Sequence, residues 1–286
     1  MKTNLIDKLI FVVALAFSVC VVGIIAQVSV RTNASAEPQG IKLPIVMYHH
    51  ILKEQSRLNK FTISPDEFRK DLQYLKDNGY TPIVMQDLIE HAQNKTPIPE
   101  KAIIITFDDG YESFYEYAYP LIKDYNIKVV FSVVGRYVDQ FSKDSDHNVI
   151  YSHCTWDQLA LMQESGLVEM QNHSYNLHTD GERRRGSMKY AGENLESYHK
   201  MLKDDLQKLQ LECAENLGCI PTTFTYPFGL ISPEALPIVK ELGFSAALTC
   251  NEKFNYITGE PEQLYHLNRF IRPHGTSLQS ILEKAK

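Results

Sequence analysis

The feature that most constrains this chain is an uninterrupted apolar run that ends in two adjacent acids. Residues 102–107 are apolar or β-branched, and Asp108, Asp109 and Gly110 follow directly. A short run without polar alternation is typical of a strand buried on both faces, as in a parallel sheet. Because buried charges are costly unless they are paired or metal-bound, we expect both acids at the open carboxyl end of the strand, where parallel α/β folds place their active sites. A strand that simply ends in an Asp-Asp-Gly turn is the alternative.

The same alternation of apolar runs and helical patterns continues along the chain. Further strands are expected near residues 43–51, 80–84, 129–134, 167–172, 222–226, 244–248 and 264–271, with helical segments between them. This order predicts an α/β fold with a parallel, barrel-like sheet wrapped by helices. The hydrophobic fraction of 44% and the charged fraction of 22% are those of a globular protein with a sizeable core.

The N-terminal region has a membrane-targeting pattern. Two lysines precede a stretch at 9–26 that is almost continuously apolar and just long enough to span a bilayer. We therefore expect a signal anchor at residues 1–30, a linker at 31–42 and a catalytic domain at 43–286. Lysines before the span predict an extracytoplasmic domain tethered to the membrane. Cleavage near Ala36, followed by secretion, is the alternative.

Charge and cysteine content limit the classes of partner. The net charge is −6, which gives no support for nucleic-acid binding. No pattern indicates an obligate protein partner. The cysteines show no C-x-x-C spacing, which argues against a zinc knuckle or a thioredoxin-like site. In an exported domain Cys213 and Cys219 are close enough in sequence to pair, although we favour free buried thiols.

Four expected strand ends carry polar or aromatic groups, namely His49 with His50, Asp108 with Asp109, His173 with His178, and the residues 226–229. One aspartate and two histidines make a suitable set of ligands for a divalent ion, and zinc suits these donors. A second, uncoordinated carboxylate could then take a proton from a water whose pKa the ion lowers toward about 7. A histidine across the cleft could protonate the leaving group.

The alternative for each histidine is an ordinary core or surface residue. For an isolated pair such as His173 and His178 that alternative would be preferred, but its combination with two acids at a strand end favours a metal site. Adjacent strand residues point to opposite faces, so only one of His49 and His50 can easily face the site.

Three motifs carry a resemblance to a known family. Residues 106–110, 173–178 and 226–229 resemble the motifs of the polysaccharide deacetylases of the NodB-homology type, carbohydrate esterase family 4. The match covers roughly residues 43–275. The resemblance implies a deformed parallel (β/α) barrel of about seven strands. It also implies that Asp108 is the general base and that Asp109, His173 and His178 bind a divalent metal, Zn²⁺, for which Co²⁺ or Ni²⁺ can substitute.

Two departures from the usual family pattern point to a subgroup. The histidines of the second motif are five residues apart rather than four, and the late Leu-x-His motif is absent. These features, with residues 47–50, are similar to the deacetylases of poly-β-1,6-N-acetylglucosamine in biofilms. Their motifs are circularly permuted, so the role of catalytic acid passes to His49, with His274 as the alternative. The family also uses an arginine to orient the base, and Arg269 and Arg272 are the candidates.

The resemblance finally implies substrate contacts. The backbone N–H of Tyr111 is expected to hold the oxyanion, and Leu177 and Phe228 to wall the acetyl pocket, beside Tyr226 and Pro227. The expected activity is metal-dependent hydrolysis of N-acetyl groups from an extracellular N-acetylglucosamine polysaccharide, with release of acetate. A deacetylase of peptidoglycan or another cell-wall glycan is the alternative. A catalytically dead, membrane-tethered carbohydrate-binding protein is a third hypothesis, and the intact set of acids and histidines argues against it.

Overall fold

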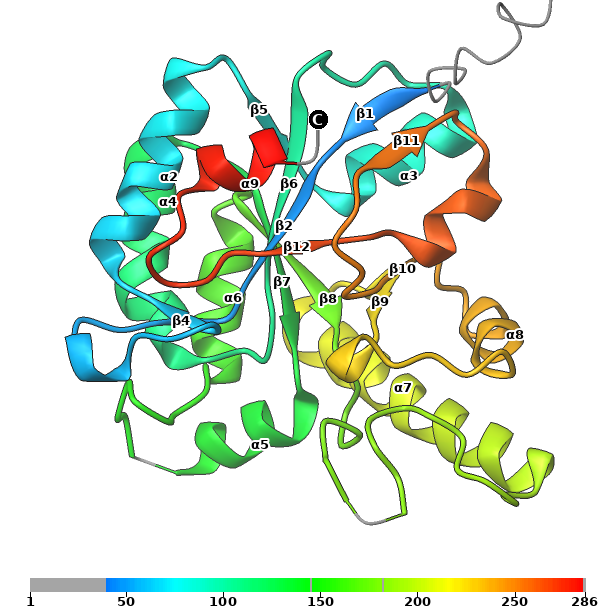
Figure 1. The fold of residues 1–286 in the computed structure, drawn as a ribbon. Coiled ribbons are helices and arrows are strands. Elements are labelled where there is room, and N and C mark those ends of the chain that lie inside the picture. Colours follow the sequence, from blue (N-terminus) through cyan, green and yellow to red (C-terminus); the bar gives the residue numbers. More distant parts are fainter. Residues whose placement is uncertain (1–39, 145, 182, 285–286) are drawn as a thin grey trace, which may run out of the picture. The chain divides into compact units, whose positions relative to one another are not determined.

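A computed structural model describes residues 40–284 apart from residues 145 and 182 (Figure 1). The predicted signal anchor at 1–30 and most of the predicted linker lie outside the described residues. The last two linker residues, 41 and 42, belong to strand β1 (Ile41–Leu43) instead. None of the described helices has both the length and the apolarity that a membrane crossing requires. Residues 40–286 group into one unit.

The fold is built on a parallel sheet with the strand order β10-β9-β8-β7-β6-β2-β12, and β5 pairs with the first half of β6. These strands are β2 (Ile45–Tyr48), β5 (Thr81–Ile83), β6 (Ala102–Phe107), β7 (Val129–Val133), β8 (Val168–Asn172), β9 (Thr223–Thr225), β10 (Ala246–Leu248) and β12 (Phe270–Ile271). An isolated parallel bridge joins Leu248 of the edge strand β10 to Leu267, which lies shortly before β12 in the chain. The predicted α/β class and parallel sheet are confirmed, and the expected deformed barrel of about seven strands takes the form of a curled half-barrel.

Helices surround the sheet, with α2 and α4 on one side and α7 and α8 on the other (Figure 1). Their bounds are α2 (Pro65–Asp77), α3 (Met85–Asn94), α4 (Tyr119–Tyr125), α5 (Gly135–Lys143), α6 (Trp156–Glu164), α7 (Leu195–Leu217), α8 (Ala235–Glu241) and α9 (Leu278–Lys284). Helix α2 begins as its sequence requires, because Ser64 and Glu67 form a capping box around Pro65.

Short elements complete the described structure. They are the 3₁₀ turns η1 (Gln55–Arg57), η3 (Pro227–Gly229) and η4 (Pro261–His266), the π-helix η2 (Phe114–Ala118), and the strands β3 (His50–Ile51), β4 (Thr62–Ile63) and β11 (Asn255–Ile257). Strand β1 pairs with β11 in antiparallel register, which ties the start of the domain to a segment over 200 residues away in sequence. The strand expected at 264–271 is reduced to β12, because η4 takes up its first residues.

The two-residue period of β6 decides where the acids point. All six residues of β6 are buried, as the apolar run predicts. Ile103, Ile105 and Phe107 join the core cluster that packs beneath α2 and η2. Ile104 belongs to the cluster on the opposite face, together with residues of β2, β7 and β10. Because side chains alternate along a strand, Asp108 follows Ile104 onto the inner face of the curled sheet.

Candidate active site

A cavity of about 430 Å³ opens at the carboxyl ends of β2, β6 and β8. Its position agrees with the expectation that parallel strands deliver polar groups to one edge of the sheet. Eight of the residues singled out in the sequence line it, namely His49, His50, Asp108, Asp109, Tyr111, His173, His178 and Phe228. The structure therefore brings together groups from four strand ends.

Asp109, His173 and His178 have the donor set of a metal site. Among the described residues, they form the only such cluster. Asp109 Oδ1 lies 3.4 Å from His173 Nε2 and 3.2 Å from His178 Nε2. One ligand atom from each residue falls within 4.8 Å of the other two. Among the described residues, this buried carboxylate oxygen has no hydrogen-bond partner. Buried polar atoms are normally paired, so an unpartnered oxygen between two imidazoles fits a bound cation.

The ring of His173 is held in the tautomer that a metal ligand requires. Its Nδ1 lies 2.7 Å from the carbonyl oxygen of Thr225 at the end of β9. A carbonyl oxygen only accepts, so Nδ1 donates and the lone pair of Nε2 is directed at Asp109. Burial alone would raise the pKa of Asp109, but the surrounding His173, His49 and His178 hold that pKa well below its ordinary value.

Asp108 has a different partner, the guanidinium of Arg269. Two parallel hydrogen bonds, from Nη1 to Oδ1 and from Nη2 to Oδ2, are each 2.8 Å long. Arg269 is fully buried, and its Nε donates to the carbonyl oxygen of Thr249 at 2.8 Å. Burial raises the pKa of Asp108, but the charge and hydrogen bonds of Arg269, together with the nearby His173 and His49, lower the pKa below the ordinary value. Asp108 is therefore an ionised carboxylate with a fixed orientation.

Arg272, the other candidate for orienting the base, lies elsewhere. Its Nε is 2.8 Å from an oxygen of Asp71 on α2, and its Nη2 donates to the other oxygen at 3.2 Å. The structure thus places Arg269 at Asp108 and gives Arg272 a separate buried ion pair. His274 is also away from the cavity, because its Nδ1 lies 2.8 Å from Glu67 and its side chain is 41% exposed.

The adjacent histidines His49 and His50 both line the cavity, and they differ in their hydrogen bonds. His50 is fixed by two hydrogen bonds, with Nε2 donating to the carbonyl oxygen of Ile150 at 3.0 Å and Nδ1 accepting from the Ser113 hydroxyl at 2.6 Å. His49 is half-buried in the cavity wall, and its buried Nδ1 has no partner among the described residues. Burial lowers the pKa of His49, and the nearby Asp109 and Asp108 offset this only in part.

Strained backbone is concentrated around the cavity. Asp109, Ser174 and Phe228 have φ values of 73°, 74° and 58°, in the left-handed region that non-glycine residues rarely adopt. Each such residue costs on the order of 1–3 kcal/mol, and such strain is typical of functional sites. The turn at Asp109 is followed by Gly110, where φ is 84° and an added Cβ would lie 3.3 Å from Val133.

Asp205 on α7 holds the loop that carries the second histidine. Its two carboxylate oxygens accept from the backbone N–H groups of Tyr175 and Asn176, each at 2.8 Å. These residues lie between His173 and His178. The contact with Asp205 therefore fixes the conformation of the segment that joins the two histidines. No local motif in the sequence indicates this contact, because Asp205 lies almost 30 residues further along the chain.

Of the other second- and third-motif residues expected to contact substrate, only Phe228 lines the cavity. Leu177 and Tyr226 belong to the core cluster beneath α7 and α8, and Pro227 is buried in η3. Phe228 does line the cavity and packs against His178 with ring centroids 4.4 Å apart. Of the predicted acetyl-pocket residues, Leu177 is therefore a core residue and Phe228 a cavity residue.

Sequence reasoning missed several lining residues, which come from loops and from the strands β2, β4 and β12. These are Met47, Lys60, Phe61, Thr62, Arg185, Cys250, Glu252 and Ile271. Arg185 belongs to an arginine run that a solvated loop would explain, and it also pairs with Asp180 at 3.2 Å. Only for Met47 does the sequence indicate a position in the cavity wall, because Met47 lies two residues before His49 and alternate residues of an extended chain share a face.

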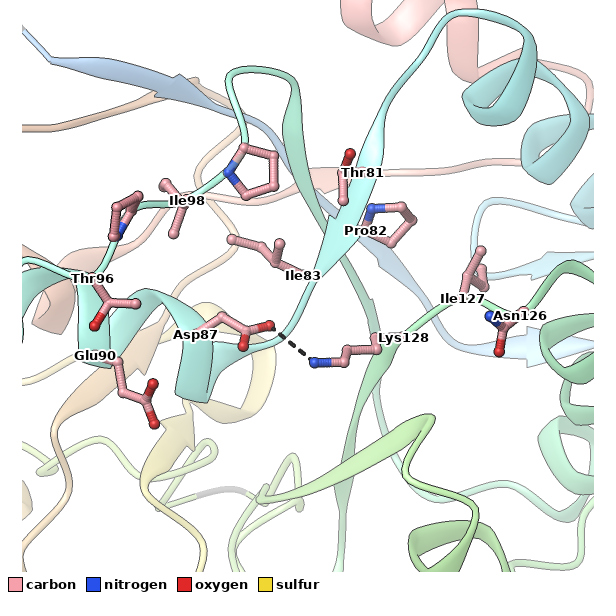
Figure 2. Close-up of a pocket in the computed structure, with 12 residues that line it drawn as sticks. Thr81, Pro82, Ile83, Asp87, Glu90, Thr96, Ile98, Asn126, Ile127 and Lys128 are labelled. Atoms are coloured by element: carbon pink, nitrogen blue, oxygen red, sulfur yellow. Dashed lines mark ion pairs between the residues drawn. The ribbon is translucent and has the colours of Figure 1, made fainter.

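Another pocket lies at the opposite, amino end of the sheet, between the start of β5 and the segment before β7 (Figure 2). Figure 2 shows an ion pair there between Lys128 and Asp87, with 3.6 Å between Nζ and Oδ2. Its lining contains two acids, Asp87 and Glu90, but no histidine or cysteine. The histidines and paired acids expected at the site therefore lie at the carboxyl ends of the strands and not in this pocket.

Comparison with known proteins gives consistent matches. A family model described as polysaccharide deacetylase matches residues 95–247. The chain is 26% identical over 257 residues to the poly-beta-1,6-N-acetyl-D-glucosamine N-deacetylase of Escherichia coli strain K12, covering 84% of this chain and 38% of that protein. It is 23% identical over 204 residues to the protein of the same name from Staphylococcus aureus strain MSSA476, covering 71% and 66%.

Solved structures show the same architecture. The structure of IcaB from Ammonifex degensii matches with a TM-score of 0.68 and 26% identity, covering 86% of this chain and 97% of that one. The E. coli relative is much longer, so this chain spans less than half of its length.

Proposed function

The chain belongs to the polysaccharide deacetylase family, as its three motifs predicted, and we propose that it removes N-acetyl groups from poly-β-1,6-N-acetylglucosamine. The observation that carries this proposal is the pairing of two unlike carboxylates at the end of β6. Asp109 lies between two imidazoles, and Asp108 is clamped by Arg269. The name of the E. coli relative and the five-residue histidine spacing support this choice of polymer.

The donor set fits a divalent metal ion, for which Zn²⁺ is the proposed identity. Asp109, His173 and His178 would hold it, since their donor atoms converge and one of them is an unpartnered buried oxygen. Imidazole nitrogens with one carboxylate oxygen are ligands that zinc prefers. When bound, such an ion lowers the pKa of a coordinated water toward about 7 and polarises a carbonyl oxygen.

Asp108 is proposed as the general base that takes the proton of the attacking water. Arg269 keeps this carboxylate ionised, and a carboxylate that accepts two hydrogen bonds still has lone pairs for a third. The backbone N–H of Tyr111, which donates to no carbonyl among the described residues, is proposed to stabilise the oxyanion.

His49 is proposed as the acid that protonates the departing sugar amine. It lines the same cavity as the two acids, at the end of β2, from where an imidazole could reach the leaving group. His274 is bound to Glu67 outside the cavity, which favours His49 over it. We further propose that residues 43–286 act outside the cytoplasm, because the substrate is an extracellular polymer and the apolar stretch at 9–26 precedes the domain.

The test is acetate release from a panel of glycans by the metal-loaded protein. Oligomers of β-1,6-linked and β-1,4-linked N-acetylglucosamine are compared with peptidoglycan, before and after chelation and with Zn²⁺, Co²⁺ or Ni²⁺ added back. We expect acetate chiefly from the β-1,6 oligomers, loss of activity on chelation, and recovery with zinc. Preference for peptidoglycan would replace the proposed polymer, and full activity after complete metal removal would refute the metal site.

The acid assignment has a test of its own. Substitution His49→Ala is expected to lower kcat by about 10²–10⁴-fold, the usual contribution of a positioned acid or base. His274→Ala serves as the matched control and should retain activity, because its ring lies against Glu67. The reverse result would move the role of the acid to His274.

A further inference from the structure

A short segment at residues 150–154, here called the strap, lies against the turn that follows the two acids. Two antiparallel backbone hydrogen bonds join them. The N–H of Glu112 donates to the carbonyl oxygen of Ser152 at 2.9 Å, and the N–H of Cys154 donates to that of Gly110 at 2.8 Å. Ser152 and Cys154 are fully buried, so both bonds are shielded from water.

This pairing directs the backbone N–H of Tyr111 away from the strap. Tyr111 and His153 lie opposite each other between the two hydrogen bonds and form an isolated antiparallel bridge. Residues in such a non-hydrogen-bonded pair turn their own N–H and C=O groups away from the partner segment. The carbonyl oxygen of Tyr111 accepts from the N–H of Phe114. Because Tyr111 lines the cavity, its own N–H is left for a group bound there.

The side chain of Tyr111 is stacked against two imidazole rings. The ring of His50 lies 4.1 Å from it, centroid to centroid, at an angle of 14°, and the ring of His153 lies 4.7 Å away at 28°. His50 is itself fixed, because it bonds to the Ser113 hydroxyl and to the carbonyl oxygen of Ile150 in the strap. Stacking and backbone pairing together leave Tyr111 little freedom to rotate.

His153 links Tyr111 to helix α5. Its ring stacks on Tyr137 with centroids 4.4 Å apart and lies 5.6 Å from the ring of Phe141, both on α5. His153 is 7% exposed, and its Nδ1 has no partner among the residues that the structure describes. Burial lowers the pKa of His153 to about 4, so the ring is neutral near pH 7. What the ring supplies is therefore its stacking faces, and neither a charge nor a hydrogen bond from Nδ1.

We propose that His153 is a positioning residue, which acts through Tyr111 to hold the backbone N–H of Tyr111 toward the oxyanion of the reaction. His153 does not line the cavity, so it acts only through this neighbour. A donor stabilises a developing oxyanion when it is aligned in advance, and loss of one such donor lowers kcat by about 10²–10³-fold. Loss of its alignment forfeits part of that factor. This inference rests on the proposed function.

The test compares two substitutions of His153. His153→Ala removes the ring beside Tyr111, whereas His153→Phe keeps a neutral aromatic ring there. We expect His153→Ala to lower kcat by about 10–100-fold with KM changed less than about twofold, and His153→Phe to stay within about threefold of wild type. Tyr151→Ala is the matched control, because Tyr151 belongs to the same strap, is 49% exposed and bonds only to Asp146. It should keep the wild-type kcat.

A transition-state analogue distinguishes alignment from a general loss of structure. A glucosamine oligomer that carries a methylphosphonamidate in place of the acetamide imitates the tetrahedral intermediate, so its affinity follows kcat/KM. Its dissociation constant should rise in His153→Ala by the same factor by which kcat/KM falls, and recover in His153→Phe. Unchanged binding of the analogue by His153→Ala, or an equal loss in His153→Phe, would overturn the inference.

Hydrogen exchange separates this inference from the proposed function. In the zinc-loaded protein, the amides of residues 110–113 should exchange faster in His153→Ala than in wild type or His153→Phe, because the turn opens more often. Equal exchange in all three proteins would overturn the inference whether or not the protein is active. Faster exchange in His153→Ala, with no acetate released from any glycan by the wild type, would refute the proposed function and leave His153 as the residue that holds Tyr111.

Discussion

Removal of Arg269 is expected to destabilise the protein strongly. The side chain is fully buried, Asp108 is 2% exposed, and two hydrogen bonds of 2.8 Å join them. Substitution Arg269→Met keeps much of the volume but leaves Asp108 without its countercharge. Breaking a buried ion pair by removing one partner costs about 3–5 kcal/mol. For a domain of this size that corresponds to a fall in Tm on the order of 10 °C.

The pair can be separated from a general packing defect by a double-mutant cycle. Asp108→Asn combined with Arg269→Met removes both charges, so the double variant should be less destabilised than the sum of the single variants, by about 1–3 kcal/mol. Urea denaturation of the four proteins at pH 7 measures this coupling. Additive free energies of unfolding, or a loss below about 0.5 kcal/mol for Arg269→Met, would refute the reasoning.

Arg272→Met provides the control for activity. Arg272 is also buried and ion-paired, but its partner is Asp71. Both single variants should lose stability, and they can be compared at a temperature where both are folded. We expect acetate release to fall by about 10²-fold or more in Arg269→Met, because the orientation of Asp108 is lost. Arg272→Met should stay near wild type, and equal losses would show that Arg269 acts only through stability.

Two further predictions concern residues around the site. Asp205→Asn removes one of the two acceptors that hold the loop before His178. Zinc affinity, measured by equilibrium dialysis, should therefore fall by about 10–100-fold. The control is Asp204→Asn, on the exposed face of α7, which should have no effect. Burial raises the pKa of Glu67, but its hydrogen bonds to Ser64, His274 and Gly275 prevail and lower it to about 2. The stabilisation that ionised Glu67 gives to the folded protein is therefore complete above about pH 4.5 and is lost as the pH falls toward 2. The difference in Tm between wild type and Glu67→Gln should shrink over that range. A constant difference would contradict this prediction.

The sequence predicted those parts of the site that depend on local patterns. The apolar run 102–107 has the length and composition of a buried strand, so both the strand and the place of the acids at its end followed from it. These features need only neighbouring residues and the geometry of an extended chain.

Features that depend on distant segments were not predictable. The choice between Arg269 and Arg272 rests on how β12, a strand of two residues, pairs with β2, and no periodic pattern exists in so short an element. The contact of Asp205 with the loop before His178, and the place of Glu252 in the cavity wall, depend on segments that the curled sheet brings together from distant parts of the sequence. The apolar Leu177 was expected at the acetyl pocket, but burial in the core beneath α7 satisfies the same hydrophobicity.

The most direct test of the central claim separates the two adjacent acids. Zinc content and acetate release are measured in parallel for Asp108→Asn and Asp109→Asn, with near-ultraviolet circular dichroism as a check on folding. Asp108→Asn is expected to bind about one zinc ion per chain but to release no acetate, because the ligands remain and the base is lost. Asp109→Asn is expected to lose zinc and activity together. Loss of zinc in Asp108→Asn with its retention in Asp109→Asn would contradict the assigned roles.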